Sequence, residues 1–297
     1  FNTLLCSIIH SVDMVLLDSD FSDSELRALG VNPKDLEKRV AVNPKRVSNI
    51  ADVFDVIAGA SSWKLTLFTS GTTGLPKRVT HGLENLTRLV RISPKHNDDV
   101  WAFAYNPTHI AGIQVFLQAL LNGNSLVDVF WVSRDVVTKR IGQYRITNIS
   151  ATPTFYRMLL PIDHEYPSVK RITFGGERFD PSLAGDMKLM FPNAKPRNIY
   201  ASTEAGSVLE STNDRFRITD HERCRIEDGR LFIHNSLLGE YNTEDGWYDT
   251  GDLVEPVDLE QSEFRFLSRA SEMINVGGYK ANPLEIEEVL CSHPFIS

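Results

Sequence analysis

Apolar and polar positions follow two rhythms along the first two thirds of the chain. Short apolar runs rich in β-branched residues predict buried strands, and longer segments with apolar positions three or four residues apart predict helices. The predicted strands cover residues 65–68, 125–132, 146–150 and 169–174. The predicted helices cover residues 83–92, 110–121, 134–144 and 181–190. This order predicts βα units around a largely parallel sheet.

The pattern changes at about residue 215. From there, short apolar or aromatic pieces are interrupted by the turn pairs Asp228-Gly229, Asp245-Gly246 and Gly251-Asp252, which favour an antiparallel β region. Near the end, Pro283 opens an amphipathic helical pattern that predicts the beginning of another domain. The expected fold class is α/β, with a large domain of mixed βα sheets, an antiparallel β region and the start of a small C-terminal domain.

Composition narrows the class of protein. Hydrophobic residues make up 42% of the 297 residues and charged residues 24%, as in a globular protein. The net charge of -8 argues against a nucleic-acid partner, and no apolar run reaches the length of a membrane span. The three cysteines lie far apart, so a reducing, cytoplasmic setting is expected. The chain begins at Phe1 and stops soon after a helical pattern starts, so we expect both ends to be incomplete.

The sharpest motif is the string TSGTTGLPK at residues 69–77, directly after a predicted strand. Its glycines free the backbone to wrap an anion, its hydroxyls add donors and its lysine adds a cation, which suits a polyphosphate. The spacing is not that of a Walker A loop, and a solvated turn is the alternative. The candidate phosphate-binding residues are Thr69, Ser70, Gly71, Thr72, Thr73, Gly74 and Lys77.

Four further motifs follow in order. They are FGGE at residues 174–177, YASTEAG at 200–206, YDTGD at 248–252 and RASEMINVGGYK at 269–280. Together with the phosphate loop, this series resembles the adenylate-forming superfamily of acyl-CoA synthetases, luciferases and peptide-synthetase adenylation domains. The resemblance implies a large AMP-binding domain over residues 1–268, and a hinge with the beginning of a small domain over 269–297.

The residues themselves suggest roles for two of these motifs. Gly175 and Gly176 lack side chains, so the backbone beside Glu177 can lie against a flat adenine ring, although a tight strand-to-helix turn is the alternative. The carboxylate of Asp252 can accept hydrogen bonds from both hydroxyls of a ribose, and turn chemistry is the alternative there.

The resemblance implies the remaining roles. Tyr200 would stack on adenine, Glu204 would hold Mg²⁺, and Arg269 would lie near the ribose and phosphate. Gly277 and Gly278 would form a hairpin turn that lines the pantetheine tunnel in CoA-using relatives, with a bare hairpin turn as the alternative. The residues beside Tyr200 that complete the expected nucleotide site are Ala201, Ser202 and Thr203.

The motifs also depart from the family's pattern. Ala201 stands where glycine is common, and Asn275 stands where many members have lysine. Relatives carry a catalytic lysine near the close of the small domain, and the sequence offers no candidate for it; Lys280 belongs to the predicted hairpin region.

Residues 107–112, PTHIAG, resemble the His-x-x-Gly segment of acyl- and aryl-CoA ligases. Amino-acid-activating relatives usually have an aspartate in this region, and none lies between Tyr105 and Gln118, so we expect an uncharged acyl or aryl acid as substrate. A histidine buried at a helix start is the alternative interpretation of His109. The expected catalytic residues are His109, Lys77, Thr203 and Glu204.

The expected activity is that of an acid–thiol ligase which uses ATP, Mg²⁺ and CoA. A carboxylic acid would first form an acyl-adenylate with release of pyrophosphate, and the thiol of CoA would then take the acyl group. Two alternatives stay open, namely an adenylation domain that loads a carrier protein and a non-catalytic nucleotide-binding relative.

Overall fold

The computed structural model describes residues 1–18, 21–32, 50–69, 76–240, 243–258, 262–276 and 279–281, with residues 283, 286, 289 and 290. The chain divides into two compact units. The first contains Phe1–Glu210 and Leu238–Tyr241, and the second contains Ser211–Leu237 and Asn242–Ser297. The predicted boundary at residue 268 concerns a hinge, and it stays a prediction.

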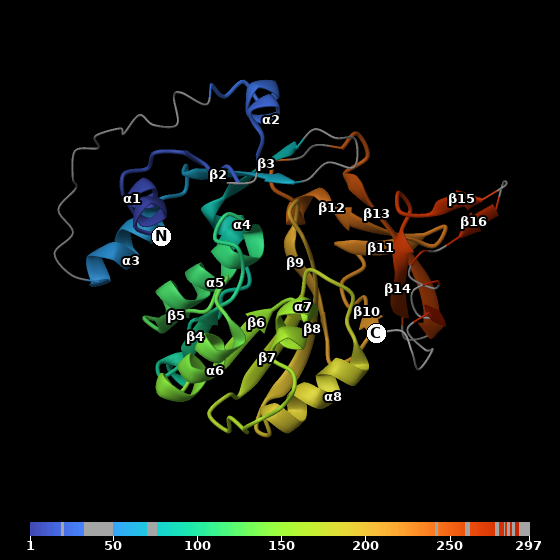
Figure 1. Ribbon diagram of the computed structural model, residues 1–297. Coiled ribbons are helices and arrows are strands. Elements are labelled where there is room, and N and C mark those ends of the chain that lie inside the picture. The colour runs from blue at the N-terminus through green and yellow to red at the C-terminus, as the bar shows by residue number, and fades with distance from the viewer. Residues whose placement is uncertain are drawn as a thin grey trace. The chain divides into compact units, whose positions relative to one another are not determined.

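A six-stranded sheet forms the centre of the first unit, with strand order β5-β4-β6-β7-β8-β9. Every pair from β5 to β8 is parallel, which confirms the predicted βα sheet (Figure 1). The strands are β4 (Val100–Phe103), β5 (Ser125–Asp128), β6 (Asn148–Ala151), β7 (Arg171–Gly175), β8 (Lys195–Ser202) and β9 (Gly206–Ser211).

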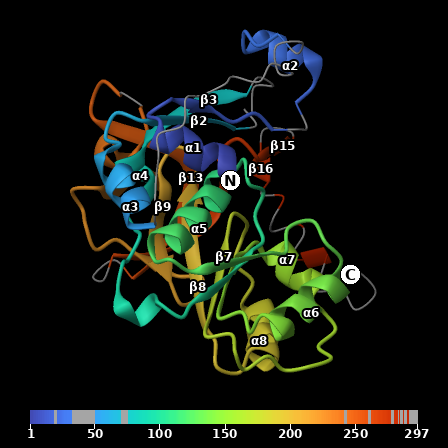
Figure 2. The ribbon, with the colours of Figure 1, turned by 90° about the vertical axis from the view of Figure 1, so that its left-hand side faces the viewer.

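Three helices gather on one side of this sheet, α6 (Arg134–Gln143), α7 (Pro153–Met158) and α8 (Pro181–Met190) (Figure 2). Their apolar side chains form one continuous core with the strands, in which Tyr156, Phe174 and Met187 are fully buried. Strands β6 and β7 lie within two residues of their predicted bounds, whereas β5 ends at Asp128, four residues before the predicted end at residue 132. Helix α8 has its predicted bounds, with Asp180 accepting from the backbone N–H groups of Ser182 and Leu183.

Helix α5 (Ile110–Leu121) also has its predicted bounds, whereas α4 (Leu83–Thr87) is shorter than predicted. The chain leaves α4 in a turn, with Val90 N–H bonded to the Thr87 carbonyl, and Pro94 follows at the 3₁₀ helix η2 (Pro94–His96). The apolar positions Leu89, Val90 and Ile92 therefore lie beyond the helix, and the predicted helix end at residue 92 is wrong.

A second, smaller sheet of the first unit has the order β1-β2-β3, with bounds Met14–Val15, Lys64–Thr69 and Lys77–Gly82. It packs with α4, α5, α1 (Asn2–Ile9) and α3 (Ile50–Gly59), while α2 (Asp23–Ala28) starts at a capping box on Ser22. Trp63 lies almost fully buried in this core, and its indole N–H donates to the Val12 carbonyl. Helices α1 and α3, which precede Trp63 in the chain, therefore contribute buried side chains to the core of this sheet.

The second unit contains a five-stranded antiparallel sheet of order β10-β14-β13-β12-β11, which confirms the predicted antiparallel region. Asp228 and Gly229 both adopt positive φ between β11 and β12, as a tight hairpin turn requires. The strands are β10 (Phe216–Arg217), β11 (Cys224–Glu227), β12 (Arg230–His234), β13 (Trp247–Asp258) and β14 (Glu263–Arg269), with the 3₁₀ helix η3 (Asn235–Leu237) after β12.

A separate two-stranded pair joins β15 (Ile274–Val276) to β16 (Tyr279–Ala281) in antiparallel register. Gly277 and Gly278 lie outside the described residues, so their predicted turn and their role at a pantetheine tunnel stay predictions. Among the described residues, none of the helices is both long enough and apolar enough to cross a bilayer.

Candidate functional site

Two motifs of the first unit, FGGE and YASTEAG, lie at one edge of the six-stranded sheet. Strand β7 ends at Gly175 and the neighbouring β8 ends at Ser202, with Gly175 opposite Ile199. Because parallel strands end at the same edge, the segments after Gly175 and around Tyr200 leave the sheet side by side. This arrangement confirms that the FGGE motif lies at the carboxyl end of a strand, where open α/β sheets place ligands.

Different structural constraints explain why each of the two positions in this motif is a glycine. Gly176 has φ +82°, a conformation that L side chains rarely adopt, so it makes the tight turn that was the alternative interpretation. A Cβ at Gly175 would lie 3.2 Å from the hydroxyl of Tyr105, which is bonded to Ser150. Burial raises the pKa of Tyr105, which keeps its phenol protonated. The role of both glycines at adenine stays a prediction.

Glu177 has a defined partner in the structure. One of its carboxylate oxygens accepts from the backbone N–H of Thr154 at 3.0 Å and from the Thr154 hydroxyl at 2.7 Å. Thr154 lies in the first turn of α7, where backbone N–H groups have no partner within the helix. The carboxylate therefore ties the FGGE turn to the start of α7, and the predicted contact of Glu177 with the cofactor stays a prediction.

The YASTEAG motif spans the end of β8, a turn and the start of β9. Tyr200, Ala201 and Ser202 are still in the strand, and the Ser202 hydroxyl accepts from the Ala205 N–H at 3.2 Å. Gly206 has φ +65°, and a Cβ there would lie 2.6 Å from the side-chain amide nitrogen of Gln114 on α5. The final glycine of the motif is therefore required by the backbone, whereas the end of the flexible Gln114 side chain could move away from a Cβ.

Three carbonyl groups in this turn accept hydrogen bonds from partners far away in sequence. The Thr203 carbonyl accepts from Nε2 of His81 at 2.7 Å, and the Glu204 carbonyl accepts from the Gly239 N–H at 2.8 Å. The Ala205 carbonyl accepts from the guanidinium of Arg88 at 3.0 Å. The Glu204 side chain, which is partly exposed, thus projects from a backbone held on several sides. No motif in the sequence pointed to His81 or Arg88.

Lys77 is the first residue of β3, and its side chain is exposed. It pairs in register with Thr69, the last residue of β2, so the two ends of the predicted phosphate loop are neighbours. Residues 70–75, which include Ser70, Gly71, Thr72, Thr73 and Gly74, lie outside the described residues, as does the side chain of Thr69. The phosphate contacts of this loop stay a prediction.

His109 stands at the N-cap position of α5, but its ring makes no capping bond and its side chain is 60% exposed. The alternative of a buried histidine at the helix start is therefore wrong. Nε2 of His109 lies 3.0 Å from a carboxylate oxygen of Asp18, which also accepts from Asn106 and Thr108. A Cβ at Gly112 would clash with the Asn106 carbonyl, which explains the glycine of this segment.

Asp252 and Arg269 face each other in the second unit as register partners on β13 and β14. The carboxylate of Asp252 is buried and lies 3.1 Å from Nε of Arg269, whose side chain is 49% exposed. The YDTGD motif lies inside strand β13, so the turn predicted at Gly251-Asp252 is wrong, and Asp249 rather than Asp252 accepts from the Gly251 N–H there. The ribose contact of Asp252 stays a prediction.

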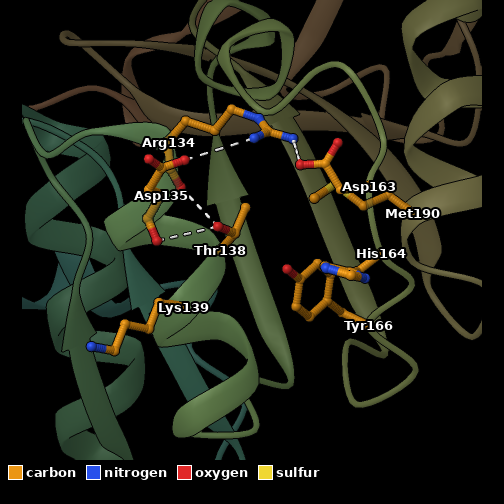
Figure 3. A pocket seen from close by; sticks show the side chains of 8 residues that line it. All are labelled: Arg134, Asp135, Thr138, Lys139, Asp163, His164, Tyr166 and Met190. Carbon is orange, nitrogen blue, oxygen red and sulfur yellow. Dashed lines mark hydrogen bonds and ion pairs between the residues drawn. The ribbon is translucent and has the colours of Figure 1, made fainter.

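A pocket of about 270 Å³ lies elsewhere in the first unit, between α6 and the segment around Tyr166 (Figure 3). None of its lining residues is a predicted site residue. Arg134 at its rim donates to Asp163 and to the carbonyls of Leu159 and Pro161, so its charge is already compensated. The lining residues are Arg134, Asp135, Thr138, Lys139, Asp163, His164, Tyr166 and Met190.

No group of three or more histidine, cysteine, aspartate or glutamate side chains among the described residues is arranged to hold a metal ion. A single partly exposed carboxylate such as that of Glu204 fits Mg²⁺ that arrives with a nucleotide, since this ion takes most of its ligands from phosphates and water.

Comparison with known proteins agrees with this arrangement. The model of the AMP-binding enzyme family matches residues 11–234, and the chain belongs to this family. The chain is 23% identical to 4-coumarate–CoA ligase-like 9 of Arabidopsis thaliana over 83% of its own length and 51% of that protein. It is 27% identical to a plipastatin synthase protein of Bacillus subtilis, covering 98% of this chain and 9% of that protein.

Among solved structures, the chain resembles the O-succinylbenzoate–CoA synthetase MenE of Bacillus subtilis in complex with ATP and magnesium. The TM-score is 0.65 at 22% identity, with coverage of 100% of this chain and 68% of the other. This likeness shows a shared fold. The chain spans about half the length of the curated plant ligase that it matches.

Proposed function

We propose that the protein activates a carboxylic acid as an acyl-adenylate and transfers the acyl group to the thiol of CoA. The observation that carries this proposal is the placement of the FGGE and YASTEAG motifs on neighbouring strands at the carboxyl edge of the sheet. Membership in the AMP-binding enzyme family and the likeness to a plant CoA ligase support it.

In the first step a carboxylate oxygen attacks the α-phosphorus of ATP, the bond to the β-phosphate breaks, and pyrophosphate leaves. Both reactants are anions, so positive charge at the leaving group dominates catalysis. Lys77, which is exposed at the start of β3, would supply such charge, and Glu204 would hold the Mg²⁺ that accompanies the nucleotide. Thr203 adds a hydroxyl beside Glu204.

In the second step the sulfur of CoA attacks the acyl carbon and a carbon–sulfur bond forms. The bond from the acyl carbon to the phosphate oxygen breaks, AMP leaves, and the thiol proton is released to solvent. The large domain over residues 1–268 and the small domain that begins with the hinge at Arg269 would rotate between the steps. Asp252 and Arg269 would bind the ribose side of the nucleotide. A cytoplasmic location fits the use of ATP and CoA.

The acid is of the acyl or aryl type and carries no charged amine. His109 supports this class, because the Asp18 carboxylate beside it already accepts from His109, Asn106 and Thr108. A substrate ammonium would have to compete with these three donors. An acid whose body is apolar meets no such competition.

ATP–pyrophosphate exchange tests the first step. Exchange should appear with one or more members of a panel of acyl and aryl acids, trapped in parallel as hydroxamates, and Lys77→Ala is the negative control. Thioester formation with CoA, but not with a holo-carrier protein, supports the ligase. Transfer only to a holo-carrier favours the relationship to plipastatin synthase instead. Nucleotide binding without pyrophosphate release would identify a non-catalytic relative.

A further inference from the structure

His81 is a fully buried histidine on the strand that begins with Lys77. Its ring lies between two acceptors, with Nε2 2.7 Å from the Thr203 carbonyl and Nδ1 3.0 Å from Oδ1 of Asn85. The amide nitrogen of Asn85 in turn donates to the Leu238 carbonyl at 3.0 Å. The ring therefore connects β3 to the turn that carries Glu204.

The acceptors around this ring determine where its protons lie. A carbonyl oxygen only accepts, so Nε2 carries a proton and donates to Thr203 in either charge state. Asn85 must turn its nitrogen to Leu238, so its oxygen faces Nδ1, which donates only when the ring is charged. The bond to Thr203 is therefore the constant part of this network.

Residues 238–240 close the arrangement from another side. The Gly239 N–H donates to the Glu204 carbonyl at 2.8 Å, and the Glu240 N–H donates to the Thr80 carbonyl at 2.6 Å. A Cβ at Gly239 would clash with the Thr80 carbonyl and approach the His81 ring to 3.0 Å. Residues 238–240 therefore pack directly against His81 and hold the Glu204 carbonyl next to it.

We propose that His81 is a positioning residue that fixes the peptide between Thr203 and Glu204 relative to the strand of Lys77, and so sets the place of Mg²⁺ on the bound nucleotide. The Thr203 carbonyl and the Glu204 N–H belong to the same planar peptide group, so holding one directs the Cα of Glu204. This inference rests on the proposed function, because it concerns the metal of the same reaction.

Two substitutions separate this role from simple burial. His81→Gln places an amide nitrogen where Nε2 lies and keeps a donor for Thr203. In His81→Asn the shorter side chain reaches only to the position of Nδ1. It can still contact Asn85, but it has no donor for the Thr203 carbonyl. Tyr156→Phe is the matched control, because this buried hydroxyl of the first unit bonds to the carbonyls of Ile149 and Thr173 and to no residue of the YASTEAG motif.

The experiment measures pyrophosphate exchange and the Mg²⁺ concentration for half-maximal rate, beside thermal unfolding of each variant. His81→Asn should raise the required Mg²⁺ about tenfold, the scale for losing a group that orients a metal ligand, whereas His81→Gln should stay within about threefold of the parent. Binding of AMP without metal should not change. Tyr156→Phe should lower the unfolding temperature without changing the Mg²⁺ requirement.

Equal Mg²⁺ requirements in the Asn and Gln variants would overturn the inference, as would a loss that follows unfolding temperature alone. If His81→Asn does not fold, Arg88→Met supplies the same test, because it removes the donor to the Ala205 and Ser207 carbonyls. If the parent protein shows no exchange with any acid, the proposed function fails. In that case calorimetry measures the affinity for ATP with and without Mg²⁺ in the parent and in each variant. An affinity that does not depend on Mg²⁺ in any of these proteins would also overturn the inference.

Discussion

Replacing Asp252 tests the nucleotide-binding role of the second unit. The side chain is 8% exposed and its carboxylate lies 3.1 Å from Nε of the half-exposed Arg269. Asp252→Ala removes a buried carboxylate but leaves the half-exposed Arg269 guanidinium in contact with water, so the cost in unfolding free energy should be about 1 to 3 kcal/mol, the range for a hydrogen bond to a charged group. Loss of bonds to the ribose hydroxyls should cost about 1 to 3 kcal/mol of binding, or roughly 5- to 150-fold in Kd.

Titration calorimetry with ATP and with 2′-deoxy-ATP separates these effects. The parent protein should bind ATP more tightly than the deoxy nucleotide, and Asp252→Ala should bind both with equal, weaker affinity. Asp249→Ala is the matched control, because Asp249 pairs with Arg230 and accepts from the Gly251 N–H in the same motif. Unchanged ATP affinity in a folded Asp252→Ala variant would remove this carboxylate from the site.

Three further predictions follow from the first unit. Lys77→Ala should slow pyrophosphate exchange roughly 10²- to 10³-fold, the scale for removing one group that stabilises transition-state charge. The melting temperature should not change, because the side chain is exposed. Exchange at the rate of the parent protein would contradict the assigned role. Glu204→Gln should abolish exchange or shift its Mg²⁺ titration strongly upward, and an unaltered titration would place the metal elsewhere. Burial lowers the folded-state pKa of His81 from its usual value of 6.5, and the charge of Arg88 acts in the same direction. The bonds to Thr203 and Asn85 and the charge of Glu204 raise this pKa, but their effect is smaller. As the pH falls, the unfolded chain binds the proton before the folded chain does, so the stabilising contribution of His81 is full above about pH 6.5 and is lost below it. The free energy of unfolding, measured with urea at pH 7.5 and at pH 5.5, should therefore differ less between the two pH values for His81→Gln than for the parent. Equal differences in the two proteins would refute the linkage.

Much of the fold follows from local patterns in the sequence. The runs that became β6 and β7 place Ile149, Ala151, Ile172 and Phe174 in one buried core, so their apolar and β-branched positions mark them as strands. Helix α8 begins and ends as predicted because Asp180 caps it and Pro181 opens it. The apolar run that forms β5 continues past the end of the strand, so the pattern did not predict where β5 ends. The strand ends where the Asp128 carboxylate accepts from the Phe130 N–H and Trp131 adopts a positive φ.

The candidate site was predictable where a motif follows a strand, and not where distant segments meet. The ends of β7 and β8 carry their motifs in sequence order, so a parallel sheet brings them together. His81, Arg88 and Asp18 act through backbone carbonyls or a neighbouring histidine many positions away. Such contacts depend on tertiary packing, and no spacing rule along the chain encodes them.

The pairing of β13 with β14 restricts how this part of the chain can vary. Asp252 stands opposite Arg269, and irregularities in the ladder follow between Leu253 and Val254 and between Pro256 and Asp258. Side chains alternate between the two faces of a sheet, so deleting a single residue inside either strand would send one member of the pair to the opposite face. Insertions and deletions in homologous chains should therefore avoid these two strands and occur in even numbers where they enter them.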